Sequence, residues 1–169
     1  RSGVFLDNCS GQGHYSIQYV KIAKIGIWDT MAKILIVDDE ESMRIPLSRL
    51  LGEMGHDVEC AATLQDGVRR VHMNPTDVVF LDVRFPEGSG LDVIPQIREA
   101  ASVPEVIIMT GLGDPDGAEL ATRSGAWDYI EKGSSLDALL LSLARALQYR
   151  EEKQSRPIRE ASASGTTAE

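Results

Sequence analysis

Short apolar runs alternate with longer amphipathic segments along most of the chain. Residues 34–37 (ILIV), 78–81 (VVFL) and 106–109 (VIIM) are continuous apolar runs, too short for helices and rich in branched side chains. Such runs are typical of strands buried on both faces, as in a parallel sheet. Weaker patterns predict two further strands, over residues 57–61 and 127–130.

Apolar residues at helical spacing lie between and after these predicted strands. The clearest stripe predicts a last helix and is formed by Leu136, Leu139, Leu140, Leu143, Ala144 and Leu147. Earlier helices are predicted over residues 43–54, 63–73, 91–100 and 116–124. Thr63 suits an N-cap, and Gly55 and Gly125 suit helix ends. Pro46 and Pro95 each lie inside a predicted helix, and we expect each to kink that helix or delay its start.

The alternation of five strands with helices predicts the fold class. Right-handed strand–helix–strand crossovers give a doubly wound α/β sheet with helices on both faces. A length of about 120 residues suits a five-stranded parallel sheet in the flavodoxin-like order 2-1-3-4-5. In that order strands 1 and 3 are neighbours, so a ligand site is expected where their carboxyl ends meet.

Composition divides the chain into three parts. Residues 1–30 carry 3 basic and 2 acidic side chains, which leaves 17 − 3 = 14 basic and 26 − 2 = 24 acidic for the rest. Met31 opens directly into the first apolar run, as a natural start would, so we interpret residues 1–30 as an upstream or vector-derived extension, with a docking arm as the alternative. Residues 31–150 form the predicted domain, and the polar residues 151–169 are expected to be a disordered tail or the start of an interdomain linker.

Charge and composition disfavour several classes of function. The net charge of −9 argues against direct binding to nucleic acid, because phosphate backbones attract basic surfaces. No run of 18 apolar residues is present, so no membrane span is expected. Cys9 and Cys60 match no metal-binding spacing and fit the reduced thiols of a cytoplasmic protein.

Carboxylates follow two of the predicted strands. Asp38 and Asp39 come directly after the first strand, and Asp82 ends the third. Like charges this close repel each other unless a cation neutralises them, and oxygen ligands suit Mg²⁺. We therefore predict a Mg²⁺ site at this edge. Glu40 and Glu41 are interpreted as residues that begin the next helix, where its dipole favours negative charge.

Polar side chains also follow the fourth and fifth strands. Thr110 ends the fourth strand, and Lys132 follows the fifth, which contains Tyr129. Taken singly, Thr110 fits a turn, Lys132 a solvated surface position and Tyr129 a ring at the sheet edge. Taken together with the carboxylates, they supply a nucleophile, a metal site and positive charge for phosphoryl transfer to a carboxylate.

Four stretches resemble the CheY-like receiver domains of two-component response regulators, over about residues 32–150. They are ILIVDDE (34–40), FLDVRFPEGSGLD (80–92), VIIMTG (106–111) and GAWDYIEK (125–132). The resemblance implies that Asp82 is the phosphoacceptor. It also implies that Mg²⁺ is held by Asp82, by Asp39 directly, by Asp38 through water and by the main-chain carbonyl of Arg84.

The same resemblance implies a switching mechanism and a partner. Thr110 and Lys132 would bind the phosphoryl oxygens, and Tyr129 would turn inward when Thr110 moves. The donor would be a phosphohistidine on a sensor histidine kinase, and the chain's own chemistry would be limited to self-phosphorylation and autodephosphorylation. Residues 136–153 are similar to the NtrC type of regulator, which implies an output in transcription. Homodimerisation is expected through the face of helix 4, strand 5 and helix 5, or along the extended last helix.

One departure from the family pattern keeps alternatives open. The family usually has proline after the lysine, whereas this chain has Gly133. A cis peptide without proline costs about 2.5–4 kcal/mol, so the geometry of the bond between Lys132 and Gly133 is left open. A degenerate receiver that acts as a phosphorylation-independent binding module is the main alternative. A haloacid-dehalogenase-like phosphatase is disfavoured because Arg84, not an aspartate, lies two residues after Asp82.

Overall fold

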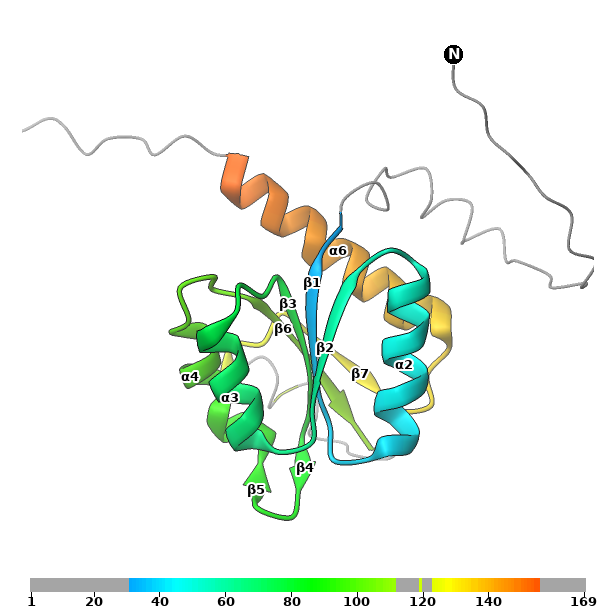
Figure 1. The fold of residues 1–169 in the computed structure, drawn as a ribbon, viewed down its shortest axis with the longest axis vertical. Helices are drawn as coiled ribbons and strands as arrows, with labels where there is room; N and C mark the ends of the chain where they lie inside the picture. The colour runs from blue at the N-terminus through cyan, green and yellow to red at the C-terminus, as the bar shows by residue number, and fades with distance from the viewer. Residues whose placement is uncertain (1–30, 112–118, 120–122, 156–169) are drawn as a thin grey trace, which may run out of the picture.

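Five parallel strands form one sheet with helices on both faces (Figure 1). The computed structural model describes residues 31–111, 119 and 123–155. The strands are β1 (Lys33–Val37), β2 (Asp57–Ala61), β3 (Val78–Asp82), β6 (Glu105–Thr110) and β7 (Asp128–Glu131). They pair in the order β2-β1-β3-β6-β7, which confirms the predicted order 2-1-3-4-5.

The helices of the described chain follow the predicted pattern with local differences. They are α2 (Glu41–Glu53), α3 (Leu64–Met73), the 3-10 helix η2 (Gly90–Val93), α4 (Ile94–Arg98) and α6 (Leu136–Ser155). Thr63 caps α3 by accepting a hydrogen bond from Asp66 N at 3.1 Å, and Gly55 ends the turn after α2 with a φ of +92°. The helix predicted over residues 116–124 lies mostly outside the described residues.

The two prolines behave differently. Pro95 lies in the first turn of α4, where a backbone N–H would have no acceptor within the helix, so proline is tolerated there. The α-helix accordingly begins at Ile94, later than the predicted residue 91, as expected. The predicted helix over residues 91–100 is accordingly split into η2 and α4. Pro46 lies inside α2, which continues on both sides of it.

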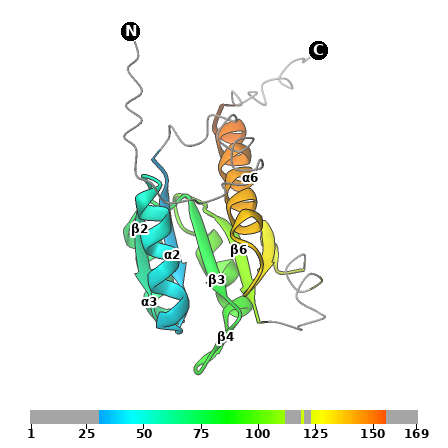
Figure 2. The same ribbon diagram turned by 90° about the vertical axis from the view of Figure 1, so that its right-hand side faces the viewer.

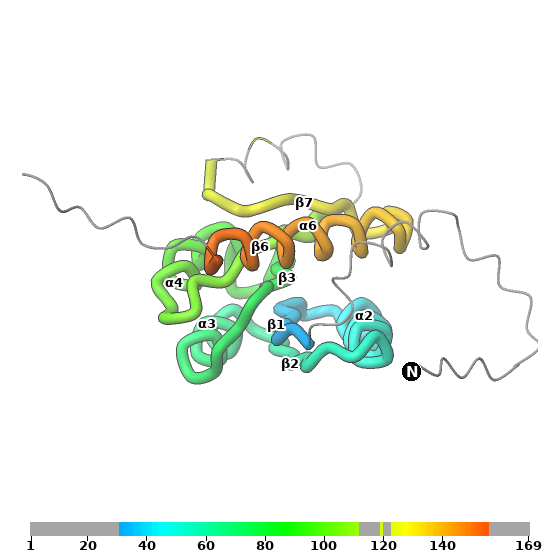
Figure 3. The backbone as a smooth tube through the Cα atoms, turned by 90° about the horizontal axis from the view of Figure 1, so that it is seen from above, coloured from blue at the N-terminus to red at the C-terminus, as the bar shows by residue number. Residues whose placement is uncertain are grey.

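Alternate side chains of the central strands β1, β3 and β6 enter two separate hydrophobic cores. On one face, Ile34, Ile36 and Phe80 pack with the apolar sides of α2 and α6. On the other face, Leu35 and Val79 pack with α3 and α4. Figure 3 shows α3 and α4 together on one side and α2 on the other. Burial on both faces is the reason that the sequences of these three strands are continuous apolar runs.

A short hairpin and a long helix extend beyond the sheet (Figure 2). The hairpin pairs β4 (Arg84–Phe85) with β5 (Gly88–Ser89) directly after β3, and no sequence pattern predicted it. Helix α6 includes residues 151–155, past the domain boundary expected at residue 150. In the part of the chain that the structure describes, no helix combines the length and hydropathy needed to cross a bilayer.

Candidate functional site

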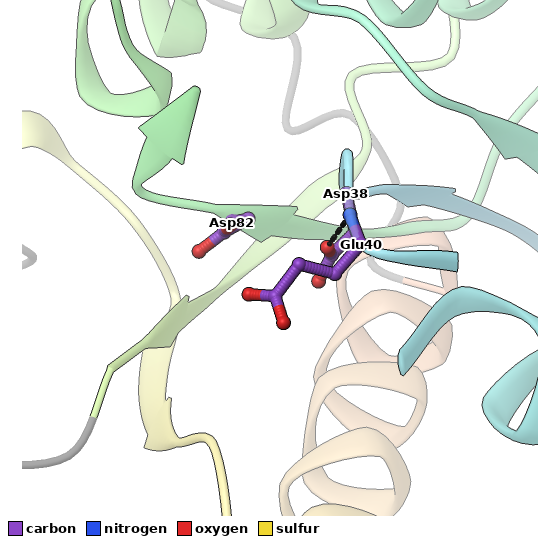
Figure 4. A group of neighbouring side chains, drawn as sticks. All are labelled: Asp38, Glu40 and Asp82. Atoms are coloured by element: carbon purple, nitrogen blue, oxygen red, sulfur yellow. Dashed lines mark hydrogen bonds between the residues drawn. The ribbon is translucent and has the colours of Figure 1, made fainter. Parts of the chain in front are cut away.

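Three carboxylates meet at the carboxyl ends of β1 and β3. Asp38 follows β1, Asp82 ends β3, and these two strands are hydrogen-bonded neighbours. Glu40 lies between β1 and α2. One carboxylate oxygen from each of Asp38, Glu40 and Asp82 lies within 4.8 Å of the others (Figure 4). The topology thus brings together acidic groups that are more than 40 residues apart in sequence.

Lys132 lies among these three carboxylates. Its Nζ is 2.8 Å from Asp82 Oδ2, 2.9 Å from Glu40 Oε1 and 3.0 Å from Asp38 Oδ2. Partial burial alone would lower the pKa of Lys132, but its hydrogen bonds to the carboxylates outweigh burial and raise that pKa. The ammonium group is therefore charged at neutral pH and available to pair with a developing negative charge.

Asp38 is the most deeply buried of the three acids, with no exposed surface. Burial raises the pKa of Asp38, although the ion pair with Lys132 and the hydrogen bond from Glu40 N, the latter at 2.8 Å, act in the opposite direction. The carbonyl of Asp38 accepts a hydrogen bond from Arg44 Nη1 at 2.6 Å. These contacts hold Asp38 against the start of α2.

Asp82 is held by the loop that follows it. Its Oδ1 accepts a hydrogen bond from Val83 N at 2.7 Å, while Oδ2 faces Lys132. Gly90 closes the loop by donating its N–H to Val83 O at 2.8 Å. A Cβ atom at Gly90 would lie 1.9 Å from the main-chain oxygen of Asp82, so only glycine fits there.

Thr110 and Tyr129 lie on neighbouring strands beside this group. Thr110 is 1% exposed, and its hydroxyl has no hydrogen-bond partner among the described atoms. Its carbonyl accepts a hydrogen bond from Lys132 N at 2.6 Å, which joins the ends of β6 and β7. Tyr129 is 40% exposed, so part of its side chain reaches the surface.

The donor set fits a hard divalent cation such as Mg²⁺. Three carboxylates surround one ammonium group, which leaves an excess of negative charge, and oxygen ligands of this kind suit Mg²⁺. Asp38 and Asp82 belong to this group as predicted. Asp39 is exposed and is not one of the three, and Arg84 lies on the adjoining hairpin.

Glu40 is a member of the group that sequence reasoning missed. It was interpreted only as a residue that begins a helix, and it does immediately precede α2. Its side chain nevertheless reaches Lys132, which donates a hydrogen bond of 2.9 Å to Glu40 Oε1. Its position within a few residues of the end of β1 was the available signal, because side chains there lie at the same edge as Asp38.

The junction between Lys132 and Gly133 is a trans peptide, since the described chain has no cis peptide bonds. Gly133 has a φ of +101°, a conformation that glycine adopts without steric cost. Lys132 reaches all three carboxylates with this trans geometry. Replacement of the usual proline therefore leaves the lysine directed into the site.

Comparison with known proteins agrees with this architecture. Residues 34–144 match the family model of the response regulator receiver domain. The chain is 35% identical over 122 residues to the regulatory protein AtoC of Escherichia coli strain K12, covering 72% of this chain and 26% of AtoC. It is 34% identical over 122 residues to the DNA-binding transcriptional regulator NtrC of Proteus hauseri, covering 72% of this chain and 26% of NtrC.

A solved structure gives the same result. The crystal structure of NtrX from Brucella abortus superimposes with a TM-score of 0.69 at 30% identity, covering 74% of this chain and 29% of that one. This chain therefore spans about a quarter of the length of these relatives. The match covers the whole sheet and the carboxylate edge, and the chain belongs to the family of response regulator receiver domains.

Proposed function

We propose that this chain is a phosphorylation-controlled switch that receives a phosphoryl group on Asp82 from a sensor histidine kinase in a Mg²⁺-dependent reaction. The observation that carries the proposal is the buried Asp82 carboxylate, 2.8 Å from Lys132 and grouped with two further carboxylates. A nucleophile, a fixed positive charge and a cation-binding edge are the components that phosphoryl transfer requires.

The transfer forms one bond and breaks one. An oxygen of Asp82 attacks phosphorus, and the bond between phosphorus and the histidine nitrogen of the donor breaks, with its electron pair returning to the imidazole. Lys132 moves from carboxylate partners to the incoming phosphoryl oxygens and stabilises their charge. A bound Mg²⁺ would offset the charge shared by the carboxylates and the phosphoryl group. Asp38, Asp82, Asp39 and the carbonyl of Arg84 are the proposed ligands, and Glu40 lies beside them.

Thr110 and Tyr129 are the proposed switch. The phosphoryl group adds about −1.5 to −2 charges next to a buried hydroxyl that has no partner among the described atoms. A hydrogen bond between them draws Thr110 toward Asp82, and the exposed ring of Tyr129 moves into the space that Thr110 leaves. The two packings differ by a few kcal/mol, so phosphorylation shifts the population between them.

The proposed setting is a cytoplasmic regulator of transcription. Relatives such as NtrC carry transcriptional regulation in their names, and this chain corresponds to about a quarter of their length. Covalent chemistry of the chain is limited to self-phosphorylation and autodephosphorylation at Asp82. Dimerisation on phosphorylation, through the β7–α6 face or along α6, is the proposed output. A phosphorylated form that stays monomeric in light scattering at high concentration would rule it out.

Intact mass after incubation with Mg²⁺ and acetyl phosphate tests the chemistry. We expect one added phosphoryl group on the wild-type chain and none on Asp82→Asn. An unmodified wild-type chain at short quench times would favour the alternative, a receiver that binds partners without phosphorylation. A reaction without added Mg²⁺, in which a chelator removes residual divalent ions, provides the control for metal dependence.

A further inference from the structure

Helix α3 begins with a hydrogen bond from a distant loop. Leu64 is its first residue, and the N–H of a first helical residue has no acceptor within the helix. Glu87, which is 23 residues away, accepts this N–H through Oε1 at 2.6 Å. The helix dipole favours a carboxylate at this end. Thr63 satisfies a different donor, Asp66 N, so the two contacts are not redundant.

Glu87 occupies the turn of the β4–β5 hairpin, which follows the phosphoacceptor strand. Phe85, on the same hairpin, is buried and packs in the same hydrophobic cluster as Leu64. The end of the hairpin is tied back by Gly90, which packs against the main-chain oxygen of Asp82. The Glu87 contact therefore joins two elements, α3 and the loop that shapes the acceptor site.

We propose that Glu87 is a positioning residue that couples the loop after Asp82 to the first turn of α3. This inference rests on the proposed function, because Arg84, a proposed cation ligand through its carbonyl, lies on the same hairpin. A hairpin held by Glu87 keeps that carbonyl in place before the cation binds. By reciprocity, cation binding at the carboxylates then stabilises the Leu64 N–H contact.

Titration of the full chain with Mg²⁺ alone, followed by amide NMR, measures the coupling. The Kd for Mg²⁺ is expected to rise about threefold to tenfold in Glu87→Ala, as fits the loss of one hydrogen bond. Glu87→Gln keeps an oxygen acceptor and is expected to recover most of the affinity. Glu99→Ala, at an exposed glutamate on α4's C-terminal side, is the matched control and should bind like the wild type.

Hydrogen exchange at the Leu64 amide gives a readout that does not depend on phosphorylation. Exchange in the wild type should slow when Mg²⁺ is added, and Glu87→Ala should exchange faster and lose this response. If Glu87→Ala exchanged faster but kept the Kd for Mg²⁺ of the wild type, Glu87 would act only as a cap of α3. That result would overturn the inference and leave the proposed function intact. A wild-type chain that binds no Mg²⁺ would overturn both.

Discussion

Asp38 carries the main electrostatic conflict of the site. It has no exposed surface and shares one lysine with Glu40 and Asp82. Burial raises its pKa above the usual value of 3.8, because the charged form loses its hydration. The folded state therefore holds the Asp38 proton more tightly than the unfolded state does. Ionisation of Asp38 accordingly costs stability as the pH rises from about 4 through its raised pKa.

Replacement of this charge should stabilise the protein at neutral pH. Asp38→Asn is expected to raise the free energy of unfolding at pH 7 by on the order of 1 kcal/mol. The reason is that the substitution removes a buried negative charge from a site that holds more negative than positive charge. The gain should shrink near pH 3.5, where the wild-type carboxyl is protonated. Urea denaturation at both pH values measures it, and an equal difference at the two would contradict the electrostatic explanation.

Thr110 offers a second test at the residue scale. Its buried hydroxyl has no partner among the described atoms, so Thr110→Val should raise the free energy of unfolding by about 1 kcal/mol. The same variant should accept a phosphoryl group yet leave the NMR signals of Tyr129 unchanged on phosphorylation. Thr110→Ser keeps the hydroxyl and serves as the control. A less stable valine variant would mean that the hydroxyl is hydrogen-bonded in solution.

At the scale of elements, Arg150 attaches the end of α6 to the edge of the sheet opposite the carboxylates. The side chain is 7% exposed, and its Nε lies 2.9 Å from Asp77 Oδ1. Its Nη1 and Nη2 each donate a hydrogen bond of 2.7 Å, to the carbonyls of Val103 and Ser102 respectively. One guanidinium thus joins the helix to the segments that precede β3 and β6.

Loss of this contact should free the last turns of α6. Arg150→Met is expected to lower the free energy of unfolding by about 2–4 kcal/mol, because Asp77 and two carbonyls lose their donor. Hydrogen exchange over residues 148–155 should accelerate. Arg150→Lys should recover only part of the loss, since an ammonium group lacks the planar fork. Unchanged exchange in Arg150→Met would show that packing alone holds the helix.

One of the two carbonyls that Arg150 binds belongs to a strained residue. Val103 has a φ of +43°, which is unfavourable for a branched side chain, and it is 42% exposed. Val103→Gly should therefore raise the free energy of unfolding by about 1 kcal/mol despite the flexibility of glycine. Ala101→Gly, at an exposed neighbour without positive φ, should lower it. Thermal unfolding of the two variants gives the comparison.

At the scale of the whole molecule, the folded state is expected to be the only form that gathers the cation ligands, because they come from separate strands. Mg²⁺ at about 100 times its Kd should then add about 2.7 kcal/mol to the free energy of unfolding. Thermal unfolding with and without MgCl₂, with NaCl at matched ionic strength as the control, measures this gain. Asp82→Asn should reduce it, and an equal gain from NaCl would indicate simple screening of the net charge of −9.

The fold could be predicted from the sequence because the three central strands, β1, β3 and β6, are buried on both faces. A continuous apolar run such as residues 78–81 has few alternatives to a central strand, and three such runs with two weaker strand patterns, alternating with helices, limit the topology. The same reasoning placed Asp38, Asp82 and Lys132 together, since parallel strands bring their carboxyl ends to one edge. The β4–β5 hairpin was not predicted, because strands of two residues are too short to show a hydrophobic period in the sequence.

By itself, the sequence determined the sheet, its order and the edge at which the charged groups meet, because the hydrophobic period is a local property and right-handed crossovers between parallel strands leave few topologies. The tertiary structure alone decided which side chains touch. Glu40, rather than Asp39, faces Lys132, since the direction of the chain between β1 and α2 sets where each carboxylate points. Arg150 and Asp77 meet across 73 residues, a contact that depends on how α6 packs on the sheet and that no local pattern encodes.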